Sequence, residues 1–378
     1  MRTYLHIAGL LLNVVLTIVL AGCANSSYYL QSVTGHLALM NAAKPVDQWL
    51  EDPQTDPALK ARLEMSQRMR RFAVAELGLP DNASYQRYAD LHRNAVVWNV
   101  VAAPPYSLAL KTWCFPVAGC VGYRGYYDEA QAKKLAAELQ SDGLEVSVYG
   151  VPAYSTLGWM NWAGGDPLLN TFIRSPEGEL ARLVFHELAH QVLYVKNDTP
   201  FNESFATAVE RMGSARWLAL HATPEAQAQY ASHDARRNQF RALTRSTRQA
   251  LAAIYASNDP LALENTAQVA IKMRVMEDFR ARYAVLKSSW GATASIAQSR
   301  AYDQWVEKAN NASFGALAAY DEWVPAFEAL FMREAHGETG VQAWQRFFEA
   351  VRQLANLPAT ERARVLKEVA SATAAASD

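Results

Sequence analysis

Apolar residues recur at three- and four-residue steps over much of this chain, which is the period of an amphipathic helix. The pattern covers residues 28–78, 129–141, and almost everything from residue 217 to the C-terminus. Residues 85–127 differ, because VVWNVVAAP is rich in β-branched residues and clusters of Pro, Gly and Tyr follow it. The segment LEVSVYGVPAYST alternates like a strand and precedes a turn at residues 164–167. This pattern predicts an α+β protein that is predominantly helical.

Residues 181–195 read ARLVFHELAHQVLYV, which is apolar on nearly every side and predicts a buried helix. Burying imidazoles and carboxylates without partners would cost roughly 1–3 kcal/mol or more per group. His186 and His190 are four residues apart, so they share one helix face and can bind the same metal ion, with Glu187 beside it. The alternative is a pair of core histidines that neighbouring groups satisfy.

A second helix is predicted directly after this one. Residues 197–199 offer an N-cap, and Pro200 suits the first helical turn. On this helix Glu203, Thr207 and Glu210 share a face. We expect Glu203 to be the third metal ligand, and Thr207 and Glu210 to orient the ligands. For Glu210 a solvated surface charge paired with Arg211 or Arg182 is the alternative.

Two histidines and one carboxylate leave a zinc coordination position open, which is typical of hydrolases. We therefore expect one Zn²⁺ per chain, held by His186, His190 and Glu203, and Glu187 as the general base that acts on a peptide substrate. The alternative is a lipid-anchored envelope binding or assembly protein with a structural zinc site. Such a site would normally have a fourth protein ligand, and no Cys or His near the motif supplies one.

The motif does not identify the donor that would stabilise the oxyanion. A small sheet is expected before the zinc-binding helix, with Tyr154 on an edge strand where a peptide could add as one more strand. An ordinary buried strand is the alternative for Tyr154. Asn310, Asn311 and Tyr320 are further candidates for contact with substrate or oxyanion, although helix capping also explains the asparagines.

The N-terminus has the pattern of a bacterial lipoprotein signal peptide over residues 1–22. Arg2 precedes an apolar stretch of residues 7–20, and Leu20-Ala21-Gly22-Cys23 predicts cleavage before Cys23, which then receives lipid. An ordinary signal peptide or a single-pass anchor is the competing interpretation, but the apolar run is short for a membrane span. We expect a body held by acyl chains on the periplasmic face of the outer membrane.

Export also bears on the two other cysteines. Exported chains meet an oxidising compartment, so Cys114 and Cys120 are predicted to form a disulfide. Zinc ligation by this pair is the weaker alternative, because the spacing is not CxxC and no histidine lies nearby.

Composition narrows the class of protein. The chain has 378 residues, with 36 Lys and Arg against 37 Asp and Glu, and its basic residues are dispersed. The charge pattern therefore lacks the basic patch that is typical of nucleic-acid-binding proteins.

The length predicts one large domain or two lobes. We expect an N-terminal helical and strand region over residues 23–175, a zinc-binding helix pair over 176–215, and a helical region over 216–378, either as separate regions or as one bilobal domain.

Several strings together resemble one known family, the bacterial predicted aminopeptidases of the zincin type, many of which carry lipoprotein signals. The strings are YYLQSV at 28–33, WCFPVAGCVGYRGYY at 113–127, AYSTLGW at 153–159, LARLVFHELAHQVLYV at 180–195, FNESFATAVE at 201–210 and NNASFGALAAYDEWVPAFEAL at 310–330. The resemblance covers nearly the whole mature chain. It implies a zincin-like core with zinc on His186 and His190 and Glu187 as base, and similarity to the NExxA ligand of gluzincins implies Glu203.

The chain departs from well-studied gluzincin aminopeptidases in two ways. Its spacer before the ligand glutamate is shorter, and it lacks a GAMEN-like stretch for gripping a free N-terminus. Endopeptidase activity therefore stays open beside aminopeptidase activity.

Overall fold

The computed structural model describes residues 26–115, 119–158, 160–256, 265–291, 296–318 and 323–375. The predicted signal peptide, Cys23 and Tyr320 lie outside these residues. Within the described ranges, none of the helices combines the length and the apolarity that crossing a membrane requires.

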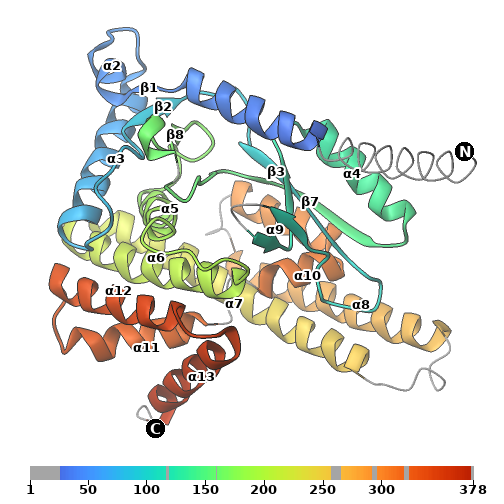
Figure 1. The fold of residues 1–378 in the computed structure, drawn as a ribbon. Helices are drawn as coiled ribbons and strands as arrows, with labels where there is room; N and C mark the ends of the chain where they lie inside the picture. Colours follow the sequence, from blue (N-terminus) through green and yellow to red (C-terminus); the bar gives the residue numbers. More distant parts are fainter. Residues whose placement is uncertain are drawn as a thin grey trace, which may run out of the picture.

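Helices dominate the structure, as the sequence predicts (Figure 1). They are an N-terminal helix of residues 26–42, α2 (Val46–Glu51), α3 (Pro57–Ala75), α4 (Glu129–Ser141), α5 (Glu177–Ala189), α6 (Thr199–His221), α7 (Pro224–Ala256), α8 (Asn265–Trp290), α9 (Ile296–Lys308), α10 (Asn311–Ala318), α11 (Val324–Ala335), α12 (Val341–Ala355) and α13 (Ala359–Ala375), with a 3₁₀ turn η1 (Asn161–Ala163). The strands are β1 (Lys44–Pro45), β2 (Arg87–Ala89), β3 (Val97–Ala103), β4 (Trp113–Phe115), β5 (Gly119–Val121), β6 (Arg124–Tyr126), β7 (Glu145–Val151) and β8 (Leu168–Leu169). The α+β class with a helical majority is confirmed.

The strands form small sheets. The longest pairing is between β3 and β7, antiparallel from Val97 opposite Val151 to Ala103 opposite Glu145, and β6 completes the order β6-β3-β7. The strand predicted to reach residue 156 ends at Val151, because Pro152 has no N–H to continue the ladder. Tyr154 therefore lies beyond the end of β7, which the strand order makes an edge strand of this sheet.

Two smaller sheets flank this one. One has the order β1-β2-β8, and β4 and β5 form the other. Cys114 and Cys120 stand opposite each other in the β4–β5 pair and form the predicted disulfide.

The helix of the His186-Glu187-Leu188-Ala189-His190 sequence (the HExxH motif) and the helix that follows it form a tight hairpin. Helix α5 ends at Ala189 rather than near residue 195, because the chain must reverse before α6 begins. Asp198 caps α6 by accepting a hydrogen bond from the backbone N–H of Phe201 at 3.1 Å, and Pro200 lies in the first turn. The Asn202 side chain closes the turn with two 2.8 Å hydrogen bonds to the backbone of Val195.

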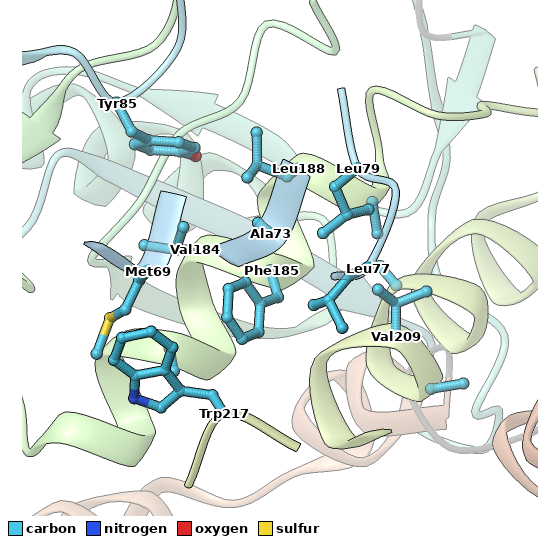
Figure 2. Packing of buried hydrophobic residues seen from close by; sticks show 14 of the residues in the cluster. Met69, Ala73, Leu77, Leu79, Tyr85, Val184, Phe185, Leu188, Val209 and Trp217 are labelled. Carbon is cyan, nitrogen blue, oxygen red and sulfur yellow. The ribbon is translucent and has the colours of Figure 1, made fainter. Parts of the chain in front are cut away.

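A large apolar core holds this hairpin in place. Figure 2 shows side chains of α3, α5 and α6 packed together, among them Met69, Phe185 and Trp217. On the other side of α6, Phe327 of α11 packs edge-to-face on Phe201, with ring centroids 5.1 Å apart. Helix α6, which carries Glu203, is therefore packed on both sides, and this packing restricts how far the Glu203 carboxylate can move.

The helices after residue 217 do not pack as one group. Helices α7 to α10 build a separate apolar cluster around Phe240, Phe279 and Phe314. Helices α11 to α13, in contrast, contribute to the large core beside α6. Helices of the C-terminal half thus pack near the α5–α6 hairpin as two separate groups (Figure 1).

Candidate metal centre

Three potential ligands converge where α5 ends and α6 begins. The Nε2 atoms of His186 and His190 are 3.1 Å apart. Glu203 Oε2 lies 3.4 Å from the first of these nitrogens and 3.7 Å from the second. The side chains are only 7–14% exposed. One potential ligand atom from each of the three residues lies within 4.8 Å of the other two, and no other such group of three histidines, cysteines or carboxylates is found among the described residues.

These separations fit a zinc ion. Tetrahedral bonds of about 2.0–2.2 Å place the ligand atoms roughly 3.3–3.6 Å from one another, close to the distances found here. Two nitrogens and one carboxylate oxygen are also a donor set that zinc accepts. Three protein ligands leave one tetrahedral position for water or substrate.

Glu210 lies directly behind His186. Its Oε2 is 3.0 Å from His186 Nδ1, and its other oxygen accepts a hydrogen bond from Arg182. This contact orients the ring so that Nε2 points towards Glu203. Burial raises the pKa of Glu210, but the charge of Arg182 and the contact with His186 outweigh it and lower the pKa to about 2. Glu210 is therefore a buried anion rather than a solvated one, and Arg211 pairs with Glu328 instead.

The two histidines differ in what supports them. His190 Nδ1 is buried and has no hydrogen-bond partner within the described part of the chain. Thr207 is almost completely buried and lines the same cleft. Of the two residues predicted to orient the ligands, Glu210 accepts a hydrogen bond from His186, whereas Thr207 lines the cleft.

Glu187 faces the cleft next to the three ligands. Burial raises the pKa of its carboxyl, which the charges of His186 and His190 oppose. In contrast, the same two histidines hold the pKa of Glu203 well below its usual range, although burial alone would raise it. Glu203 therefore stays ionised between the two histidines, whereas Glu187 is more basic and lines the cleft.

The cleft has a volume of about 760 Å³, and several tyrosines and one phenylalanine contribute to its wall. The aromatic residues that line it are Tyr28, Tyr29, Phe115, Tyr123, Tyr127, Tyr154 and Tyr194. Tyr154 is one of them, with its ring 5.6 Å from that of Tyr127. Val151, at the end of the edge strand β7, lies in the same wall.

The two asparagines expected near the cleft lie elsewhere, so that expectation needs correction. Asn310 donates a hydrogen bond to the Val146 carbonyl at 2.9 Å and accepts one from the Ser313 N–H, which caps α10. The Asn311 amide is fully buried, accepts from the Tyr255 hydroxyl and donates to the carbonyl of Pro105. Their amides join α10 to the sheet and to α7, so capping and packing explain them.

Two residues of this region were missed in the sequence. Tyr123 lines the cleft, where burial, followed by the charge of Glu203, raises its pKa. Asp166 lies under the cleft wall, and its carboxylate accepts a hydrogen bond from the Thr156 N–H at 3.1 Å. The available signals were a tyrosine in the glycine-rich stretch after the cysteines and an acidic residue in a Gly-Gly turn, and neither has a fixed spacing to the HExxH motif.

Comparison with known proteins gives one match. Residues 27–366 match the model of a family described as "Putative aminopeptidase". No curated protein and no solved structure matches the chain.

Proposed function

The chain belongs to the putative aminopeptidase family, and we propose that it is a zinc-dependent peptidase with a zincin-like core. His186, His190 and Glu203 would hold the zinc ion. The observation that carries this proposal is their convergence within 4.8 Å at a buried hairpin, with Glu210 behind His186. A buried cluster of this kind is costly without a cation, because two imidazoles and a carboxylate have lost water.

When bound, zinc would supply Lewis acidity, which polarises a scissile carbonyl and makes water more acidic. Glu187 would take a proton from the attacking water onto its carboxylate and then pass it to the leaving amine. Its raised pKa suits a group that must both accept and release that proton. Glu210 would keep the His186 ring in one orientation throughout.

We assign the oxyanion donor to Tyr123. Its phenol lines the cleft and is close enough to Glu203 and Glu187 for their charges to raise its pKa. A protonated hydroxyl at this place can donate a hydrogen bond to the developing oxyanion. Tyr123→Phe should lower kcat about 10²–10³-fold and leave zinc content unchanged. Tyr194→Phe, from the same cleft, is the matched control, and the reverse pattern would move the role to Tyr194.

The substrate would be a peptide that lies along the cleft. Edge strand β7 leads into it at Val151. Within the described residues no second strand pairs with β7, so an extended peptide could pair with its edge near Val151. We also propose that the protein is exported, lipidated at Cys23 and held on the periplasmic face of the outer membrane, for which the sequence pattern of residues 1–23 is the support.

The decisive experiment measures zinc content and turnover together. Wild type, Glu187→Gln and His186→Ala are assayed on amino-acid amides and on peptides with blocked N-termini. We expect Glu187→Gln to keep zinc and lose turnover, and His186→Ala to lose both. Glu179→Gln is the matched control, since Glu179 lies in the same cleft on α5 but pairs with Arg237.

Two results would change the proposal. Equal activity of wild type and Glu187→Gln, or no activity in either with zinc bound, would favour a binding protein with a structural zinc. Cleavage of blocked peptides would exclude a strict aminopeptidase and leave a broader peptidase.

A further inference from the structure

The N-terminal helix has an unusual distribution of polarity. Residues 26–42 contain no Asp, Glu, Lys or Arg, and neither does any position between Arg2 and Lys44. A surface helix of a globular protein normally turns its charged residues outward and its apolar residues inward. This helix lies along the edge of the molecule above the β6-β3-β7 sheet (Figure 1, darkest blue).

One face of the helix is firmly docked on the protein. Gln31 accepts a hydrogen bond from the Tyr127 N–H at 3.1 Å. Arg124 stacks over the ring of Tyr28, 4.0 Å from its centroid. Gly35 lets the helix approach the Tyr127 ring, where any larger side chain would clash. The inward face is therefore held by polar and aromatic contacts.

The opposite face is apolar and open. Leu30, Val33 and Leu37 are 64%, 56% and 52% exposed, and their spacing of three and four residues places them on one stripe. Within the described residues they are among the most exposed large apolar side chains. Leaving such a stripe in water is unfavourable, so something apolar is expected to cover it.

We propose that this stripe lies on the lipid surface of the membrane. Cleavage before Cys23 would remove the apolar stretch 7–20 and leave Cys23 at the start of the chain that leads into this helix. Ser26, the first described residue of this helix, is three residues after Cys23, so lipid attached at Cys23 would bring the stripe to the bilayer. An interfacial helix strengthens membrane binding in proportion to the apolar area that it buries, so the stripe would add to the hold of the acyl chains at Cys23.

This orientation gives the cleft a defined position. Tyr28, Tyr29 and Ser32 of the same helix line the cleft that holds His186 and His190. One wall of the cleft therefore stands at the membrane surface, and peptides tethered to or lying near that surface would be the favoured substrates. This consequence depends on the proposed peptidase activity and lipid anchor, whereas the contact of the stripe with lipid is measured separately.

The test uses the mature lipidated chain, which begins at Cys23, in vesicles of phosphatidylethanolamine and phosphatidylglycerol. A nitroxide is attached at Val33→Cys, and collisions with oxygen and with a water-soluble nickel complex are measured. Val285→Cys is the matched control, because it is also a helical valine and 73% exposed. We expect the label at Val33 to collide mostly with oxygen, and several-fold less with nickel than the label at Val285 does. A second label at Leu37 should behave like the one at Val33.

Two outcomes would overturn the proposal. Equal nickel access at positions 33 and 285 would mean that the stripe stays in water. Spectral broadening at position 33 that disappears on dilution with unlabelled protein would mean that a second copy covers it. The mass of the N-terminal peptide reports lipidation at Cys23 independently, and turnover reports the peptidase activity, so failure of either is told apart from failure of this inference.

Discussion

Replacing Glu210 with Gln tests whether the carboxylate behind His186 is needed for metal binding. The substitution keeps the size of the side chain and one acceptor oxygen, and removes the negative charge. In the native protein that charge faces His186 Nδ1 at 3.0 Å and also Arg182, and both partners of the ion pair are at most 10% exposed. The change therefore removes charge from a buried network without creating a cavity.

Two effects follow, on stability and on metal affinity. Removing one partner of a buried ion pair typically costs about 3–5 kcal/mol, since the remaining charge is left uncompensated. Asp234 lies 3.8 Å from Arg182 and the new amide still accepts a hydrogen bond. We therefore expect a smaller loss of about 2–3 kcal/mol in the free energy of unfolding. Loss of a group that orients a ligand histidine should weaken zinc binding about 10–100-fold.

Urea unfolding of the metal-free protein measures the first effect, and competition with a chromophoric chelator measures the second. Glu328→Gln is the matched control, because its pair with Arg211 spans 3.5 Å and is partly exposed. There we expect a change below about 1 kcal/mol and unaltered zinc affinity. Glu210→Gln that binds zinc as tightly as wild type would refute the orienting role.

Three further predictions concern the surroundings of the site. Burial raises the pKa of Asp166 from 3.8 to about 6, so the folded state binds an extra proton between these values. In urea unfolding, wild type should therefore lose stability relative to Asp166→Asn as pH rises from about 4 to about 6, by at most about 3 kcal/mol. A difference in unfolding free energy between the two proteins that stays constant over this range would contradict the prediction. In the same assay Phe327→Ala should lower the free energy of unfolding by about 3–5 kcal/mol, whereas Met332→Ala on the exposed side of α11 should change it little. Equal effects of the two substitutions would contradict the packing of α11 in the core. Asn311→Ala should lower the melting temperature, because the hydrogen bond from Tyr255 is lost, and should leave turnover per folded molecule unchanged. A loss of turnover without a loss of stability would indicate that Asn311 contacts the substrate after all.

Much of the local structure near the site could be predicted from the sequence. The four-residue spacing of His186 and His190 is enough to put both rings on one helix face, because helix geometry is local. The Asp198 cap, helix α4 and the disulfide pair were also predictable, since each depends on neighbouring residues or on compartment. The end of α5 was not, because apolar residues continue past Ala189 while the chain already turns towards α6.

Which residues line the cleft could not be predicted from the sequence, because the cleft is formed by segments far apart in the chain. Asn310 and Asn311 have the residue types of a polar site, yet packing of α10 against the sheet takes up their amides. Tyr123 has no spacing relation to His186 and His190. It follows β5, which contacts the loop between α5 and α6 through the hydrogen bond from the Cys120 N–H to the Asn197 side chain.

The sequence by itself determined the types of the candidate ligands, the common helix face of His186 and His190, and the absence of charge from the N-terminal helix. Only the tertiary structure decided which oxygen stands behind His186, which tyrosines line the cleft and which side of the N-terminal helix is left open. The physical reason is that helix spacing arises from bonds between near neighbours, whereas a cleft is formed where distant segments pack to exclude water.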